Sequence, residues 1–171
     1  MTWQDDKRWS DRFVPQIKGI LGEHLISESP VEEDAERNSD LIVLTLNAVR
    51  IACRIRKYQY LQSFGNEFTV RAGRPSGNKT ELAKIIEGWG DFFFYGFSDQ
   101  EESVIIQWRL ICLKSFRLWL WQTMRMNNGE LPGKMMTNKD GSGCLAVFRT
   151  EEIPTSALIA SHLAILTRGI F

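Results

Sequence analysis

Hydrophobic residues along the chain fall into short runs whose spacing predicts a mixture of helices and strands. Apolar positions three and four apart indicate helices, and alternating or continuous apolar runs indicate strands. Helices are expected over 13–26, 79–87, 114–126 and 156–167. Strands are expected over 41–46, 49–60, 67–71, 91–97, 104–113 and 145–149. Together these elements predict an α+β protein in which helices flank a small mixed β-sheet.

The first two predicted strands are adjacent in sequence and are expected to form a hairpin. Only the two residues 47–48 separate the run 41–46 from the run 49–60, and two residues suffice for a tight turn. In the second run, apolar residues alternate with arginines that include Arg54 and Arg56. Because alternate residues of a strand share a face, this strand is expected to carry one basic face.

Length and composition favour one globular domain that spans residues 1–171. Hydrophobic residues make up 43% of the chain and charged residues 25%, which is typical of a folded domain. No apolar run is long enough for a membrane span, and the N-terminus lacks the apolar core of a signal peptide. The three cysteines are far apart and form no zinc-type motif. A reduced, cytoplasmic setting without a membrane is therefore expected.

The charge balance limits how the protein can bind nucleic acid. Lys and Arg number 21, Asp and Glu also number 21, and the net charge is therefore zero. Such a protein is not expected to bind with its whole surface, but a local basic groove is compatible with neutrality. The alternative is a solvated sheet face that the acidic segment 32–36 balances. The basic residues expected to contact nucleic acid are Arg50, Arg54, Arg56, Lys57, Arg71, Arg74 and Lys79, with Tyr58, Tyr60 and Phe68 interleaved.

A carboxylate at the start of the predicted hairpin points toward phosphodiester chemistry. Asp40 precedes the run 41–46, and Arg54 and Arg56 lie on the following strand. In a hairpin these three side chains come near one point. Hydrolysis of a phosphodiester uses such a group, because carboxylates hold Mg²⁺, the metal activates water and a cation offsets the charge on the phosphate.

The order of these elements resembles the PD-(D/E)XK nuclease superfamily. In that family the second strand carries an acid, any residue and then a lysine, and the matching positions here begin at Arg54 and end at Arg56. Arg54 cannot bind a metal as the acid does, and Arg56 takes the lysine's place. The resemblance implies that Asp40 and a displaced acid, Glu81, hold Mg²⁺ or Mn²⁺. It also implies that Arg56 or Lys84 stabilises the phosphate during hydrolysis.

The chain is also similar to a group of phage and prophage proteins of uncharacterised function. The similarity covers about two thirds of the chain, so a nuclease-like core is expected over 12–126 and a C-terminal extension over 127–171. It implies a viral or prophage origin, and DNA is expected rather than RNA. The motifs that carry it are Asp40-Leu41, Arg54-Ile55-Arg56, Phe68-Thr69-Val70-Arg71, Ser76-Gly77-Asn78-Lys79-Thr80-Glu81 with Lys84, and Gly88-Trp89-Gly90-Asp91 with Tyr95.

Ordinary structural roles remain open for several of these residues. Glu81 and Lys84 lie three residues apart, which also fits a surface ion pair on one helix face. Asp91 precedes a strand and fits a cap at its start as well as a place in the site.

Three functions are compatible with the sequence. The first is metal-dependent hydrolysis of nucleic acid. The second is a catalytically inactive nuclease fold that binds nucleic acid or a host protein, which the arginine at position 54 favours. The third is a phage assembly or host-takeover protein that acts through protein contacts, because Trp119 and Trp121 cannot both point inward on one helix.

Overall fold

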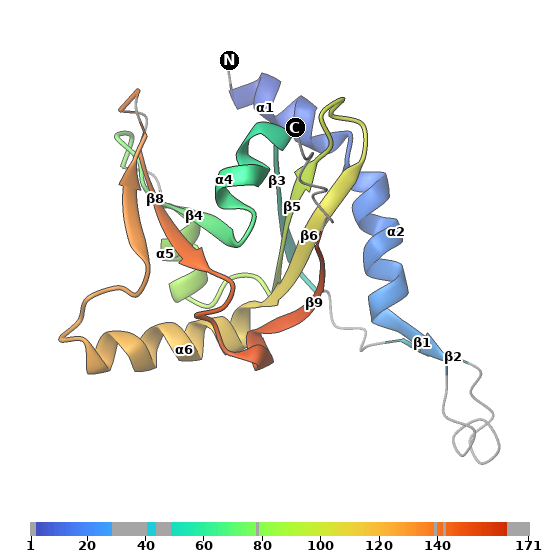
Figure 1. The fold of residues 1–171 in the computed structure, drawn as a ribbon. Coiled ribbons are helices and arrows are strands. Elements are labelled where there is room, and N and C mark those ends of the chain that lie inside the picture. The colour runs from blue at the N-terminus through green and yellow to red at the C-terminus, as the bar shows by residue number, and fades with distance from the viewer. Residues whose placement is uncertain are drawn as a thin grey trace, which may run out of the picture.

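Two main β-sheets, with helices packed around them, make up the described part of the chain (Figure 1). The structure is a computed structural model, and it describes residues 3–28, 41–43, 49–77, 79–138, 140–141 and 143–163. It confirms the predicted α+β class, with a mixed sheet of four strands and a second sheet of three strands.

The four-stranded sheet is mixed, and its first strand lies at an edge. Its strands in spatial order are β3 (Ile51–Arg56), β5 (Phe92–Ser98), β6 (Ile105–Cys112) and β9 (Leu158–His162). β3 runs parallel to β5 with Arg54 opposite Tyr95, whereas the other neighbours are antiparallel. Side chains of β3 therefore alternate between two faces, and Arg54 and Arg56 share one of them.

The three-stranded sheet is antiparallel throughout, and its first strand also lies at an edge. Its strands in order are β4 (Glu67–Gly73), β8 (Cys144–Arg149) and β7 (Lys134–Thr137). β8 pairs with β4, and β9 pairs with β6. The residues expected as a C-terminal extension thus contribute strands to both sheets.

Helices cover both faces of the four-stranded sheet (Figure 1). Phe13 and residues of α2 pack on one face, against Phe94, Trp108 and Leu110. The opposite face meets the three-stranded sheet, α5 and α6. The helical elements are α1 (Trp3–Asp11), α2 (Val14–Leu25), η1 (Tyr58–Tyr60), α4 (Leu61–Phe64), α5 (Glu81–Ile86), α6 (Leu113–Met126) and η2 (Thr155–Ala157).

An aromatic cluster centred on Phe68 holds the two sheets and α6 together. The Phe68 ring is fully buried, and its centroid lies 5.4 Å from that of Phe148 on β8 and 5.5 Å from that of Phe116 on α6. The rings of Phe93 and Tyr95 on β5 each lie 6.4 Å away in edge-on geometry. Such edge-on contacts add to the free energy gained by burying the rings.

The predicted hairpin is wrong. β2 (Leu41–Val43) pairs antiparallel with β1 (Ile26–Glu28), and β3 pairs with β5 instead. The physical reason is that β5 is buried on both faces from Phe93 onward, so it needs a hydrogen-bonded strand on each side.

The closing helix expected over 156–167 is also wrong where the chain is described. Thr155–Ala157 forms a 3₁₀ turn, and β9 follows it. Pairing with the free edge of β6 places Leu158 against one core and Ala160 against the other, so tertiary context overrides the helical spacing.

The strand predicted over 49–60 is too long, because β3 ends at Arg56 and η1 follows it. The remaining helices and strands predicted within the described ranges appear close to their expected bounds. α1, η1, α4 and β7 were not predicted. Within the described ranges, no helix combines the length and the apolar character needed to cross a membrane.

We expect Phe68→Ala to lower the free energy of unfolding by about 3–5 kcal/mol, because it empties the centre of the aromatic cluster. Urea denaturation followed by circular dichroism measures this loss. The matched control is Leu118→Ala on α6, where the side chain is 57% exposed and a change within about 0.5 kcal/mol is expected. Equal losses in the two variants would contradict the position of the cluster.

Candidate functional site

A groove of about 1170 Å³ lies beside β3, and four parts of the chain line it. These are α1, β3 with the turn that follows it, β4 with the turn at 74–76, and the loop between β5 and β6. Single residues of α5 and of β8, and the residue after β7, complete the lining. Six lining residues are basic: Lys7, Arg54, Arg56, Lys57, Arg71 and Arg74. Three are acidic: Asp11, Glu81 and Glu102. We call this feature the basic groove.

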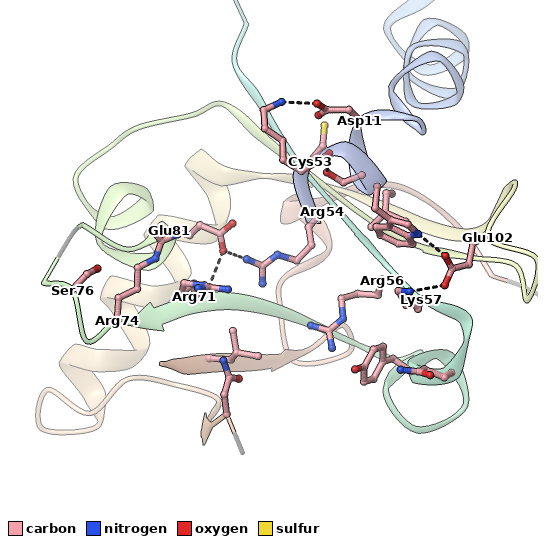
Figure 2. A pocket seen from close by; sticks show the side chains of 18 of the residues that line it. Asp11, Cys53, Arg54, Arg56, Lys57, Arg71, Arg74, Ser76, Glu81 and Glu102 are labelled. Carbon is pink, nitrogen blue, oxygen red and sulfur yellow. Dashed lines mark hydrogen bonds and ion pairs between the residues drawn. The ribbon is translucent and has the colours of Figure 1, made fainter. Parts of the chain in front are cut away.

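Glu81 ties β3 to β4 across the floor of the basic groove. Glu81 begins α5, whose N-terminus is capped by the Thr80 hydroxyl accepting from the Ala83 amide at 3.2 Å. Glu81 Oε2 accepts a hydrogen bond from Arg54 Nη2 at 2.5 Å and another from the Arg71 backbone amide at 2.9 Å. We call this pair of contacts the Glu81 bridge. Figure 2 shows Arg54, Arg71 and Arg74 gathered around the carboxylate.

A buried polar chain continues from the Glu81 bridge into the core. Arg54 Nη1 donates to the carbonyl oxygen of Thr69 at 3.2 Å, and Thr69 Oγ1 lies 3.2 Å from the Tyr95 hydroxyl. Because these polar groups satisfy one another, they can be buried between the sheets without a large desolvation cost. The Arg54 guanidinium is therefore held in one position.

Arg109 is a second positioned cation, and it lies wholly inside the protein. Its side chain is 1% exposed and donates to the carbonyl oxygens of Gly65 and Glu67. Burial lowers the pKa of Arg109, and the nearby Tyr95 opposes that change. These contacts fix the start of β4, so we assign Arg109 to the fold and not to ligand binding.

Arg56 lies on the same face of β3 but has a different partner. Its guanidinium carbon lies 4.4 Å from the centroid of the Tyr60 ring, which is cation–π distance. Tyr60 packs partly buried against the aromatic core. Figure 2 shows the Arg56 side chain pointing into the space between β3 and the second sheet.

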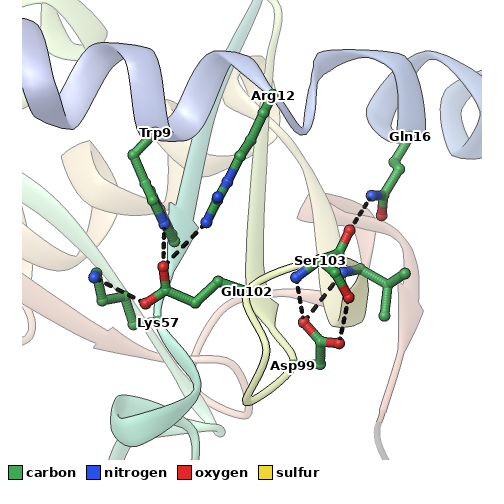
Figure 3. A network of polar contacts seen from close by, with 8 residues as sticks. Trp9, Arg12, Gln16, Lys57, Asp99, Glu102 and Ser103 are labelled. Atoms are coloured by element: carbon green, nitrogen blue, oxygen red, sulfur yellow. Dashed lines mark hydrogen bonds and ion pairs between the residues drawn. The ribbon is translucent and has the colours of Figure 1, made fainter.

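Glu102 closes the other end of the basic groove (Figure 3). Its Oε2 accepts from the indole nitrogen of Trp9 at 2.6 Å and from Arg12 at 3.0 Å, and its Oε1 pairs with Lys57 at 2.8 Å. The adjoining turn is set by Asp99, whose carboxylate accepts from the backbone amide and the hydroxyl of Ser103. Glu102 thus fastens α1 to the end of β3.

Three arginines of the basic groove keep their charge available. In the part of the chain that the structure describes, no carboxylate lies within ion-pair distance of Arg56, Arg71 or Arg74. Arg54 and Lys57, by contrast, are neutralised by Glu81 and Glu102. Lys7, the sixth basic residue of the groove, pairs with Asp11. Among the described residues, the groove therefore combines three paired cations with three that are free to meet an anion.

The structure brings together most of the predicted basic residues. Arg54, Arg56, Lys57, Arg71 and Arg74 all line the basic groove, and Glu81 joins them.

Three predicted site residues lie elsewhere. The side chain of Lys79 pairs with Glu87 at 2.8 Å, and Lys84 is exposed outside the lining of the groove. The Arg50 amide donates to Asp91 at 2.8 Å, also outside the groove. Asp91 therefore takes the structural role at the start of a strand. The first turn of α5 packs beside β4, so Glu81 forms its ion pair with Arg54 in place of the ion pair considered with Lys84.

Asp40 lies outside the described residues, and the described residues alone do not fit a divalent metal. No group of three or more His, Cys, Asp or Glu side chains converges in the described ranges. Glu81 presents its Oε2 to two donors, and a guanidinium beside it would repel a metal ion. We derive no chemical step through a metal from these residues.

Sequence patterns missed the contribution of α1 and the loop after β5. Lys7 and Trp9 line the basic groove, and Glu102 contacts Trp9 from 93 residues further along the chain. The spacing of nearby residues cannot predict a contact between residues so far apart in the sequence, so it is visible only in the folded structure.

Comparison with known proteins adds no relative to this description. No family model matches the chain, and no curated protein or solved structure matches it.

We expect the contribution of Glu102 to stability to vanish in acid. Hydrogen bonds from Lys57 and Trp9 hold the pKa of Glu102 below its ordinary value. A lowered pKa in the folded state stabilises the fold above the unfolded pKa, about 4.3 for Glu, and this stabilisation is lost as the pH falls below that value. Glu102→Gln should therefore unfold at less urea than wild type at neutral pH and at the same urea concentration in acid.

The matched control for this prediction is Glu101→Gln, which changes the exposed neighbouring carboxylate. Its unfolding midpoint should follow that of wild type at every pH. A Glu102→Gln protein with the wild-type midpoint at neutral pH would show that the contacts of Glu102 with α1 add nothing to stability.

Proposed function

We propose that the basic groove binds nucleic acid through its phosphates, and that the described residues do this without a metal. The observation that carries the proposal is the set of three arginines, Arg56, Arg71 and Arg74, that line one groove without a carboxylate partner in the described chain. A guanidinium donates two parallel hydrogen bonds to phosphate oxygens, so arginines suit this ligand better than lysines do.

The arrangement of the cations supports an extended anion over a small one. Arg56 comes from β3, Arg71 from β4 and Arg74 from the turn after β4, so positive charge lines two sides of the groove. The Glu81 bridge holds β3 and β4 beside each other. Because the protein as a whole is neutral, binding must depend on this local charge and must weaken steeply with salt.

Hydrolysis of the bound strand by a nuclease-like core remains a proposal, and it depends on Asp40 as a metal ligand. The carboxylate expected on the second strand is replaced by Arg54, which already engages Glu81, one of the two acids that the resemblance assigns to a metal. This arrangement favours binding over cleavage.

Replacing two of the free arginines with glutamates should weaken binding strongly. We expect the Arg56→Glu/Arg71→Glu double variant to lose about 100-fold in affinity for a short DNA strand, with the slope of log affinity against log salt reduced by about 2. Fluorescence anisotropy at several salt concentrations measures both quantities.

The matched control is Lys114→Glu/Arg125→Glu, which makes the same change in net charge on exposed positions of α6 outside the groove. This control should bind within about threefold of wild type. Equal losses in the two double variants would show that net charge, and not the groove, governs binding. Failure of wild type to bind any nucleic acid, together with binding of an acidic peptide, would replace the proposal with a protein partner.

Substitution of Glu81 separates binding from hydrolysis. We expect Glu81→Gln to bind DNA about threefold to tenfold more tightly than wild type, because it removes a negative charge from the groove while its amide oxygen can still accept the hydrogen bonds that hold β3 beside β4. Wild type and Asp40→Asn should bind alike, and supercoiled DNA with Mg²⁺ or Mn²⁺ should stay uncut. Metal-dependent cutting by wild type that is lost in both Asp40→Asn and Glu81→Gln would overturn this expectation and establish a metal-dependent nuclease.

A further inference from the structure

Arg56 is the one arginine of the basic groove whose described contacts include an aromatic ring. Its guanidinium carbon lies 4.4 Å from the Tyr60 centroid, and both residues line the groove. Tyr60 is in turn packed against the aromatic core, and its backbone amide donates to the carbonyl oxygen of Lys57 at 3.0 Å. The ring is therefore a fixed support beside Arg56, and both side chains border the groove.

The other aromatic residue of the basic groove is arranged differently. Trp9 donates its indole N–H to Glu102, and the Lys57 ammonium lies 5.4 Å from its ring centroid. Phe13 packs against the same indole edge-on at 5.2 Å. Trp9 is thus engaged by protein contacts, which leaves the Arg56 plane as the surface on which a flat group can lie.

We propose that Arg56, supported by Tyr60, is a stacking platform for an unpaired base, so that the basic groove takes single-stranded nucleic acid in preference to duplex. This inference rests on the proposed function. A guanidinium plane stacks on a base as an aromatic ring does, and it adds charge that a neighbouring phosphate can use. Arg71 and Arg74, which have no ring contact among those described, then bind the flanking phosphates.

The size and walls of the groove favour the same ligand. Its volume, about 1170 Å³, is only slightly above that of a pocket for a drug-sized molecule, so it accommodates a few nucleotides of one strand. α1 lies on one side and the turn at 74–76 on the other, as Figure 2 shows. A duplex keeps its bases stacked inside, so it can offer Arg56 a phosphate but no base face.

The test compares Arg56→Lys with Arg74→Lys on matched ligands. Both variants keep the positive charge and lose the planar guanidinium, but only Arg56→Lys removes a guanidinium that contacts an aromatic ring. The ligands are a short oligothymidylate, the same length of duplex, and the oligothymidylate with one or more bases removed and the sugar–phosphate chain intact. Anisotropy gives the affinity of each protein for each ligand, and circular dichroism checks that the variants are folded.

We expect wild type to bind the single strand about tenfold more tightly than the duplex, and Arg56→Lys to lose about tenfold on the single strand alone. Arg74→Lys, which loses a phosphate contact but no ring contact, should weaken the binding of all three ligands by the same factor. Wild type should bind the base-free strand about tenfold more weakly than the intact strand, whereas Arg56→Lys should bind the two strands with equal affinity.

Two results would overturn the stacking platform while leaving the proposed function intact. They are equal binding of single strand and duplex by wild type, and equal binding of intact and base-free strands by wild type. The second result needs no variant, so it decides the question even if Arg56→Lys does not fold. Failure of the proposed function looks different, because wild type would then bind none of the three ligands.

Discussion

The Glu81 carboxylate is the contact on which the arrangement of the basic groove depends. It accepts hydrogen bonds from the Arg54 side chain on β3 and the Arg71 amide on β4, and it stands at the start of α5. Two edge strands from different sheets are thereby held beside each other. Because the Arg54 side chain is only 17% exposed, loss of its partner would leave a largely buried charge without compensation.

The core elements of the fold were predictable, but their pairing was not. β5, β6 and α6 follow directly from their apolar runs, and the Thr80 hydroxyl caps α5. The parallel pairing of β3 with β5 and the pairing of β9 with β6 are long-range contacts that local spacing does not encode. α1 was missed because it is polar along most of its length and buries little apolar surface.

The candidate site was predictable where it follows a strand and unpredictable where it depends on tertiary contacts. The alternation along β3 correctly places Arg54 and Arg56 on one face. It cannot distinguish an arginine that Glu81 neutralises from one that stacks on Tyr60, although the first supports the fold and the second is available to a ligand. The role of Glu102 depends on a turn that packs against α1, and nothing in the sequence near it marks that contact.

The central claim is that nucleic acid occupies the basic groove, and the most direct measurement is hydrogen exchange with and without a saturating oligothymidylate. We expect slower exchange in peptides that cover 53–57 and 71–76, and unchanged exchange in the C-terminal half of α6, which lies outside the groove. Protection confined to α6, or no protection at a ligand concentration that saturates binding, would contradict this claim.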